Sequence, residues 1–180
     1  SKSDYLLEGI KVIDAASFIA GPSAATIMSD FGAEVIKIEP QFGDSLRNLI
    51  LNGRMPEGKE NYCWELTSRN KKSISLNLKD KKAHEILVEL IKDADVFITN
   101  MPFPIRKKLK ITSQDIRPHN NKIIYASLTG YGEVGPDADR TAYDSMAWWA
   151  RSGLMDWVRP SDNSPVAWST PGMGDHPTGM

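Results

Sequence analysis

The stretch GIKVID at residues 9–14, followed by AEVIKI at residues 33–38, decides the fold that this sequence predicts. Both runs are short, apolar and rich in β-branched residues, which is typical of buried strands. Between them, residues 23–31 place apolar side chains at helical spacing, with Pro22 suited to the first turn and Gly32 as a candidate C-cap. A strand, a helix and a second strand within about 30 residues form a βαβ unit. We therefore expect an α/β fold, a Rossmann-like open parallel sheet with helices on both faces, because near-continuous apolar strands indicate burial on both sides.

The remaining chain continues this alternation. Further strands are expected at residues 71–78, 96–99 and 122–128, and helices at residues 80–92, 113–119 and 144–151, the last with Asp144 as its N-cap. The helix at residues 80–92 places Ala83, Ile86, Leu87, Leu90 and Ile91 on one apolar stripe.

Residues 39–70 break the pattern, because Gly43, Gly53, Pro56 and Gly58 interrupt every candidate helix. A connection of this length is uncommon unless it is functional or packs on something else. We expect a long excursion from the sheet that reaches a ligand or a second subunit.

Composition excludes several classes of function. The 180 residues carry 22 basic and 23 acidic side chains, a net charge of -1, so no global field favours a nucleic acid or an anionic membrane as partner. The single cysteine, Cys63, excludes an internal disulfide and a cysteine-rich zinc site. No apolar run is long enough for a membrane span, and the first residues have no apolar signal core, so we expect a cytoplasmic protein without a metal. The loop after the first strand carries only Gly21, which does not support NAD or FAD binding.

The stretch PGMGDHPTGM at residues 171–180 surrounds Asp175 with glycines and prolines. Two interpretations remain open: a shaped loop that exposes the carboxylate to a ligand, or a turn in which Asp175 is the N-cap of a helix that starts near Pro177. Both roles can coexist, because a carboxylate at a helix N-terminus is held as an anion.

Other local features also have two interpretations. Asn100 follows a strand, where open α/β sheets bind ligands. The basic cluster at residues 106–110 is either a solvated helix face or a phosphate site, and Gly130-Tyr131-Gly132 is either a ligand-contacting turn or a plain strand end. Four tryptophans wall an apolar pocket, or belong to the core or a subunit contact: Trp148, Trp149, Trp157 and Trp168.

Several motifs together resemble the family III CoA-transferases of the CaiB/BaiF type, which include formyl-CoA transferase and the carnitine and bile-acid enzymes. They are LEGIKVID (7–14), AGPS (20–23), FGAEVIKIE (31–39), GDSLR (43–47), NKKSISLNLK (70–79), ADVFITN (94–100) and GYG (130–132). GYGEVGPD (130–137), WARSG (149–153) and PGMGDH (171–176) are most similar to the 2-hydroxyacyl branch, which includes the phenyllactate and 2-hydroxyisocaproate CoA-transferases.

The resemblance implies an interlocked homodimer whose subunits have a Rossmann-like large domain and a smaller domain. Residues 1–180 would form the N-terminal part of the large domain, with the C-terminal remainder, the small domain and a glycine-rich loop over the site absent from this sequence. Acyl-CoA and a small carboxylic acid, with a 2-hydroxy acid as one candidate, would be the substrates. Coenzyme A would be a substrate and no cofactor would be bound permanently.

The resemblance also implies a site. Asp175 matches the nucleophile, which forms a mixed anhydride and then an aspartyl-CoA thioester. The positions that match coenzyme A contacts are Ile19, Ala20, Leu76, Lys79, Asn100 and Lys108, while Tyr143 and Asp144 match residues of the acyl site. Pro40 and Thr141 stand where some members carry an arginine and a lysine, and Lys37 and Arg47 are the candidates to compensate.

Two alternatives accompany this prediction. The family contains α-methylacyl-CoA racemases, whose catalytic pair begins with a histidine before an aspartate. Tyr143 occupies that histidine position here, so one of the two bases is lost. The other alternative is a CoA-binding fragment without catalysis.

Overall fold

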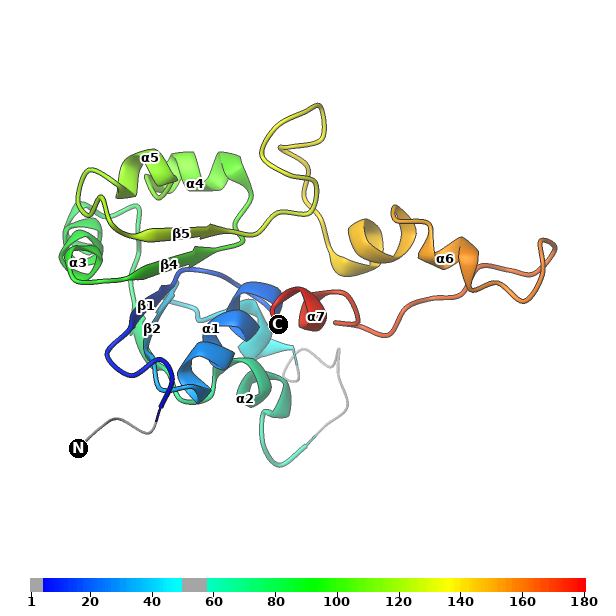
Figure 1. The fold of residues 1–180 in the computed structure, drawn as a ribbon, viewed down its shortest axis with the longest axis horizontal. Coiled ribbons are helices and arrows are strands. Elements are labelled where there is room, and N and C mark those ends of the chain that lie inside the picture. Colours follow the sequence, from blue (N-terminus) through cyan, green and yellow to red (C-terminus); the bar gives the residue numbers. More distant parts are fainter. Residues whose placement is uncertain (1–4, 50–57) are drawn as a thin grey trace.

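The computed structural model describes residues 5–49 and 58–180, and within them five parallel strands form one sheet in the order β3-β2-β1-β4-β5 (Figure 1). The strands are β1 (Lys11–Asp14), β2 (Glu34–Glu39), β3 (Lys72–Ser75), β4 (Val96–Thr99) and β5 (Ile124–Ser127). The helices are α1 (Ala20–Asp30), the 3₁₀ helix η1 (Ser45–Asn48), α2 (Tyr62–Ser68), α3 (Lys81–Lys92), α4 (Phe103–Leu109), α5 (Ser113–Ile116), the π-helix η2 (Ser145–Ala150), α6 (Leu154–Trp157) and α7 (Asp175–Thr178). None of the helices in these residues has the length and apolar character to cross a bilayer.

Two apolar layers cover the two faces of the sheet, as the strand composition predicted. On one face, α1 packs through Ala25 against a cluster that includes Val12, Val35 and Ile98. On the other face, Leu87 and Ile91 of α3 join the cluster around Phe97. Strand β1 lies in the middle, where Val12 is in register with Val35 of β2 and with Val96 of β4. The fold is therefore the predicted open parallel sheet with helices on both faces.

The strand order creates a crevice at the carboxyl edge of the sheet. In the sheet, β2 and β3 lie on one side of β1, and β4 and β5 lie on its other side. At such a switch point the connections after the two neighbouring strands diverge, which leaves room for a ligand. The connections concerned here follow β1, at residues 15–19, and β4, at Asn100.

The region between β2 and β3 contains helices that the sequence did not predict. Asp44 caps η1 by accepting a hydrogen bond from the Leu46 N–H at 2.9 Å, and Asn61 caps α2 by accepting one from the Trp64 N–H at 3.3 Å. Side-chain caps of this kind satisfy backbone donors at a helix start and allow short helices between glycines. Gly53 and Pro56, which suggested an irregular excursion, lie outside the described residues.

Two other predicted elements differ in detail. Strand β3 ends at Ser75, three residues before the predicted end at Leu78; Leu76 and Asn77 are irregular, and Leu78 and Lys79 form a turn. On α3, Ile86 is 44% exposed, whereas Leu87 and Ile91 are buried. The apolar stripe is thus narrower than predicted, because a helix on one face of a sheet buries only the side chains that point at it.

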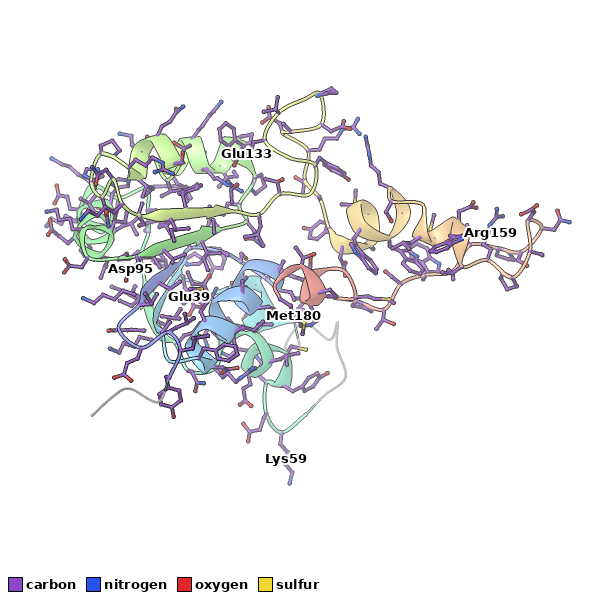
Figure 2. All side chains as sticks on the ribbon, viewed as in Figure 1. Glu39, Lys59, Asp95, Glu133, Arg159 and Met180 are labelled. Atoms are coloured by element: carbon purple, nitrogen blue, oxygen red, sulfur yellow. The ribbon has the colours of Figure 1, made fainter. Side chains whose placement is uncertain are left out.

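After β5 the chain leaves the sheet as an arm, defined here as residues 129–170, which carries η2 and α6 (Figure 1). Arg159 lies in its outer part, away from the sheet, while Met180 lies beside α1 (Figure 2). The chain returns through α7, which packs on the first turn of α1. A Cβ at Gly179 would lie 2.6 Å from the Ala20 carbonyl oxygen, so only glycine permits this approach. The return brings Asp175 to the carboxyl edge of the sheet.

A buried cluster of charges fixes the same edge from inside. The Lys37 ammonium lies 3.0 Å from Asp44 and 3.7 Å from Asp14, and all three side chains are at most 2% exposed. Lys37 also donates to the Ala16 carbonyl oxygen at 3.0 Å. The Lys71 ammonium donates to Asp14 at 2.9 Å. Because each charge has a partner, burial is tolerated, but removal of one member would leave an uncompensated charge.

Replacement of Lys37 by methionine should therefore lower the free energy of unfolding by about 3–5 kcal/mol, as is usual when one member of a buried ion pair is removed. The matched control is Lys72→Met, because Lys72 pairs with Glu34 at 2.7 Å with side chains 73% and 46% exposed. That surface pair should contribute about 0–1 kcal/mol. Urea denaturation of the two variants measures the difference, and equal losses would contradict a special role for the buried cluster.

Candidate functional site

The loop that follows β1 forms one wall of the candidate site, and Asn100 holds it in place. The Asn100 side chain accepts a hydrogen bond from the Ser17 N–H at 2.8 Å and donates one to the Ser17 carbonyl oxygen at 2.7 Å. This reciprocal pair joins the ends of β1 and β4 across the switch point. Asn100 therefore lies at the end of β4, as the sequence predicted, and its side-chain amide makes its hydrogen bonds to the loop.

The next residue of this loop, Phe18, has a left-handed backbone with φ of 70°. This conformation is uncommon for a bulky residue and requires support from its surroundings. The Asp44 carboxylate supplies that support by accepting the Phe18 N–H at 3.2 and 3.3 Å. Gly21 then lets the start of α1 approach the loop, since a Cβ there would lie 2.4 Å from the Ala16 Cβ. The loop is thus fixed on three sides before any ligand arrives.

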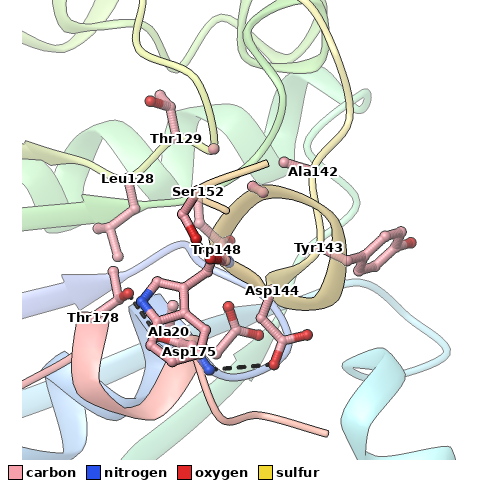
Figure 3. Close-up of a pocket in the computed structure, with 14 residues that line it drawn as sticks. Ala20, Leu128, Thr129, Ala142, Tyr143, Asp144, Trp148, Ser152, Asp175 and Thr178 are labelled. Carbon is pink, nitrogen blue, oxygen red and sulfur yellow. Dashed lines mark hydrogen bonds between the residues drawn. The ribbon is translucent and has the colours of Figure 1, made fainter. Parts of the chain in front are cut away.

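Asp175 is the first residue of α7 and lies half-buried opposite this loop. Gly174 occupies the N-cap position, with no side-chain cap, so the prediction of Asp175 as the N-cap of a helix starting near Pro177 is wrong. The Gly174 N–H donates to the Asp144 carboxylate at 3.4 Å, a contact drawn in Figure 3. A Cβ at Gly174 would lie 2.7 Å from the Cβ and Cγ atoms of Trp148, so glycine is required there.

The surroundings of Asp175 make its carboxyl a weaker acid than an ordinary aspartate. Burial raises the pKa of the Asp175 carboxyl, the negative charge of Asp144 raises it further, and His176 opposes the shift. The direction of this shift is opposite to the one that a helix N-terminus produces. Helix α7 has only four residues, so its dipole is small beside the cost of desolvation.

Three cavities meet at Asp175. The Trp148 cavity, of about 310 Å³, lies between η2 and α7 and is the one drawn in Figure 3. The Thr141 cavity, of about 400 Å³, extends from Asp175 along the ends of β4 and β5. The Cys63 cavity, of about 270 Å³, lies toward η1 and α2. A fourth, the Lys79 cavity of about 310 Å³, follows β3 and shares Met101 with the Thr141 cavity.

The structure brings most of the predicted site residues to these cavities. Tyr143 lines all three cavities that meet at Asp175, and Asp144 lines the Trp148 and Cys63 cavities. Ile19 lines the Cys63 cavity and Ala20 the Trp148 cavity. Asn100 lines the Trp148 and Thr141 cavities.

Two basic residues are engaged inside the fold, and a third lies on the surface. Lys108 is exposed on α4, and its neighbour Leu109 lines the Lys79 cavity, as do Leu76 and Lys79. Lys37 is buried in the charge cluster, so it does not compensate for Pro40 or Thr141. The Arg47 guanidinium also has a partner, because it donates two hydrogen bonds to the Glu39 carboxylate, at 2.7 and 2.8 Å. Burial alone would raise the pKa of the Glu39 carboxyl. Hydrogen bonds from Arg47 and Ser73 outweigh this effect and lower the pKa of Glu39 to about 2.

The basic cluster at residues 106–110 is neither wholly solvated nor a simple phosphate site. Arg106 is 1% exposed and donates to the carbonyl oxygens of Met101 at 2.5 Å and Leu128 at 2.9 Å. It also contacts Ser127 and Glu133. A guanidinium has several donors in a fixed plane, so it can join the ends of two strands in this way. Arg106 therefore supports the chain on which Gly130 lies.

Several cavity residues were not identified from the sequence, or were left between two interpretations. Gly130 lines the Trp148 and Thr141 cavities, and a Cβ there would lie 2.0 Å from the Ala142 Cβ, so its glycine serves close packing at the site. Among the tryptophans, Trp148 lines a cavity and Trp149 is buried, with its indole N–H donating to the Ala167 carbonyl oxygen at 2.8 Å. Trp157 and Trp168 are 84% and 91% exposed and do not line any of the four cavities described above. The residues of α2 that line the Cys63 cavity were not predicted as site residues, because the sequence predicted no helix there.

Comparison with known proteins identifies relatives of the whole described region. The family model described as CoA-transferase family III matches residues 7–180. The (R)-2-hydroxy-4-methylpentanoate CoA-transferase of Clostridioides difficile is 40% identical over 176 residues, which are 97% of this chain and 44% of that protein. The cinnamoyl-CoA:phenyllactate CoA-transferase of Clostridium sporogenes is 39% identical over 176 residues, 97% of this chain and 42% of that protein.

A solved structure agrees with these relatives. The crystal structure of a CAIB/BAIF family protein from Brucella suis superposes with a TM-score of 0.82 and 27% identity, over 93% of this chain and 44% of that one. The chain therefore spans less than half the length of these curated relatives and of this structure. The family predicted from the motifs is confirmed.

The contact between Gly174 and Trp148 generates a prediction about the site. Gly174→Ala should displace the Trp148 ring and lower the free energy of unfolding by about 1–3 kcal/mol, the usual cost of overpacking. Near-ultraviolet circular dichroism reports the ring, and urea denaturation reports the stability. Met173→Ala is the control, because Met173 is 46% exposed beside it in the chain. An unchanged tryptophan signal in Gly174→Ala would contradict the close contact.

Proposed function

The chain belongs to CoA-transferase family III, and on that premise we propose that this protein transfers coenzyme A from an acyl-CoA donor to a carboxylic acid. A 2-hydroxy acid is the acceptor that we favour, because both relatives described above are named for such acids. The observation that carries the proposal is the position of Asp175, a half-buried carboxylate where three cavities meet at the carboxyl edge of the sheet.

In the proposed mechanism, an Asp175 oxygen attacks the thioester carbonyl and expels coenzyme A as a thiolate, which leaves a mixed anhydride. The thiolate then attacks the aspartyl carbonyl, releases the donor acid and forms an aspartyl-CoA thioester. The acceptor carboxylate attacks this thioester, and the thiolate released attacks the acceptor carbonyl of the new anhydride. Acceptor acyl-CoA leaves and Asp175 is restored. Covalent catalysis thus divides one difficult transfer into easier steps.

The environment of Asp175 suits this role. A carboxylate that is partly desolvated and faces a like charge has a raised pKa and is a stronger nucleophile than one in water. Asp144, through its contact with the Gly174 N–H, positions the backbone directly before the nucleophile. Tyr143 stands where a racemase would need a second base, and a phenol is a poor base at neutral pH, so the racemase alternative is not favoured.

We propose that coenzyme A lies along the Lys79 and Thr141 cavities, with its thioester end at Asp175. Met101 lines both cavities, so they are neighbours along the carboxyl edge of the sheet. Leu76 would contact the adenine and Lys79 would face the phosphates as a point charge. Ile19 and Ala20 would border the thioester, and Asn100 would act by fixing their loop. Lys108 would contribute charge from the outer surface of α4.

We further propose a cytoplasmic protein that works as an interlocked homodimer, with residues 1–180 as the N-terminal part of a larger domain. Exposed apolar side chains on the arm support a subunit contact there, among them Trp157 at 84% and Val134 at 91% exposure. Isolated exposed apolar residues are common, but a group of large ones on one segment is typical of an interface.

Labelling tests the nucleophile. Incubation of the full-length protein with an acyl-CoA donor, followed by hydroxylamine, should modify Asp175 as a hydroxamate that peptide mass spectrometry locates. Asp175→Asn should lose this label and lower kcat by at least about 10⁴-fold, in the range found when a catalytic nucleophile is removed. A turnover-competent protein whose label lies elsewhere would refute the assignment of Asp175.

The pH dependence tests the role of Asp144. Asp175 must be ionised to attack, so its raised pKa makes activity fall on acidification at a higher pH than an ordinary aspartate would. Asp144→Asn removes the neighbouring charge but keeps one acceptor oxygen, so it should move this acidic limb to lower pH. The pH profile of kcat/KM for the two proteins measures the shift. An acidic limb that moves to higher pH, or stays in place, would show that Asp144 does not act on Asp175 through its charge.

A further inference from the structure

The guanidinium of Arg106 lies behind the Thr141 cavity and contacts two of its walls, although Arg106 does not itself line that cavity. We propose that Arg106, together with Glu133, is a positioning residue for coenzyme A. It holds the two walls at a fixed separation, and its loss weakens binding of the coenzyme more than it slows the chemistry at Asp175. This inference rests on the proposed function, because that function assigns the Thr141 cavity to coenzyme A.

The two walls come from the segments that follow β4 and β5. One wall consists of residues 101–103, which connect β4 to α4. The other consists of residues 128–130, directly after β5, together with Ala138 and residues 140–142 of the arm. The chain thus enters α4 on one side of the cavity and the arm on the other.

The hydrogen bonds of the sheet reach their end just before the cavity. Thr99 of β4 is in register with Ser127 of β5, and the Leu128 N–H donates to the Thr99 carbonyl oxygen at 2.9 Å. Beyond this bond the two segments diverge, because one turns into a helix and the other leaves the sheet. A connection between them at this point has to come from a side chain.

Arg106 supplies that connection from one turn inside α4. Its Nε donates to the Met101 carbonyl oxygen at 2.5 Å, on the first wall, and its Nη2 donates to the Leu128 carbonyl oxygen at 2.9 Å, on the second. Its Nη1 contacts the Ser127 hydroxyl. A planar guanidinium holds its donors in one fixed arrangement, so the side chain itself sets the distance between the two carbonyl oxygens.

Glu133 extends the connection to the arm. Its carboxylate lies 3.2 Å from the Arg106 Nη1 and also accepts a hydrogen bond from the Ser127 hydroxyl. Figure 2 shows Glu133 beside α4. The Arg106 side chain is 1% exposed and that of Glu133 is 46% exposed, so the buried cation is neutralised by a carboxylate from the second wall's own segment. The position of the arm at the cavity is therefore tied to the same guanidinium.

The expected kinetic effect follows from the place of these walls. They contact the coenzyme away from the reacting carbonyl, so their contacts are the same before and during the reaction. Interactions of this uniform kind lower KM without raising kcat. A residue that only supports the fold acts differently, because a smaller folded fraction lowers kcat per mole of protein and leaves KM unchanged.

The kinetic test compares Arg106→Lys with Arg117→Lys in the full-length protein. Lysine keeps the charge but has a single nitrogen, which cannot hold both carbonyl oxygens in the geometry of a guanidinium. Arg106→Lys should therefore raise KM for acyl-CoA by at least about tenfold while kcat stays within about threefold of the wild-type value. Arg117 is exposed at the end of α5, so the same exchange there should change neither parameter.

Two results of this comparison would overturn the proposal. One is a KM in Arg106→Lys equal to that in Arg117→Lys. The other is a loss of kcat that equals or exceeds the rise in KM, which would show that Arg106 serves the fold and not the binding of the coenzyme.

A second variant keeps the proposal testable if Arg106→Lys does not fold. Glu133→Gln retains one acceptor oxygen and removes the charge, and hydrogen bonds to charged groups are about twice as strong as neutral ones, so the Kd of coenzyme A should rise by at least about threefold. Isothermal titration calorimetry measures this Kd. Glu85→Gln is the matched control, because Glu85 pairs with Lys81 at 3.9 Å on the exposed surface of α3. Equal Kd values in the two variants would also overturn the proposal.

The two proposals can fail separately, because binding of coenzyme A requires no transfer. Weaker binding in Arg106→Lys and Glu133→Gln, in a protein that transfers coenzyme A between no pair of acids, would overturn the proposed transfer while supporting the positioning role. Transfer with wild-type KM in both variants would leave the transfer intact and overturn the positioning role.

Discussion

The buried ammonium of Lys37 is the constraint on which the geometry of the site depends. Through Asp14 and Asp44 it joins the carboxyl ends of β1 and β2 to the start of η1. Asp44 in turn holds the Phe18 N–H, so the left-handed turn before α1 is tied to the same cluster. Buried ion pairs contribute little net stability relative to apolar packing, but their partners have few alternative arrangements. We infer that this cluster specifies one conformation of the loop, at a point where apolar contacts alone would permit several.

A second constraint comes from the far end of the sequence. Helix α7 packs on α1 because glycine at 179 removes the side chain that would separate them, and glycine at 174 does the same beside Trp148. These contacts place Asp175 against a carboxylate, Asp144, and away from water, which raises its pKa. The same close packing that positions the carboxylate therefore also determines its protonation. Geometry and electrostatics at the site have one physical origin.

The sequence predicted the central fold well, because residues 9–38 contain the apolar strands and helical spacing of a βαβ unit, and these depend on local pattern. It did not predict η1 and α2, whose starts depend on the caps Asp44 and Asn61. Lys37 was a candidate for phosphate binding because a lysine in a strand gives no sign of partners distant in sequence. The position of Asp175 was expected from family resemblance, while its pKa depends on burial and on Asp144, which no local pattern contains. The cavities follow from tertiary packing and were not predictable residue by residue.

The contact between α7 and α1 also bears on how the protein is made. The first βαβ unit involves neighbours in sequence, so it can form as soon as residues 9–38 are available, whereas α7 must find α1 across about 150 residues of intervening chain. Domains fold from the N-terminus during synthesis, and contacts distant in sequence form late. The carboxylate that we propose as the nucleophile thus reaches its place only after the sheet that receives it is built. A chain that has not finished folding would carry a preformed crevice and no reactive group within it.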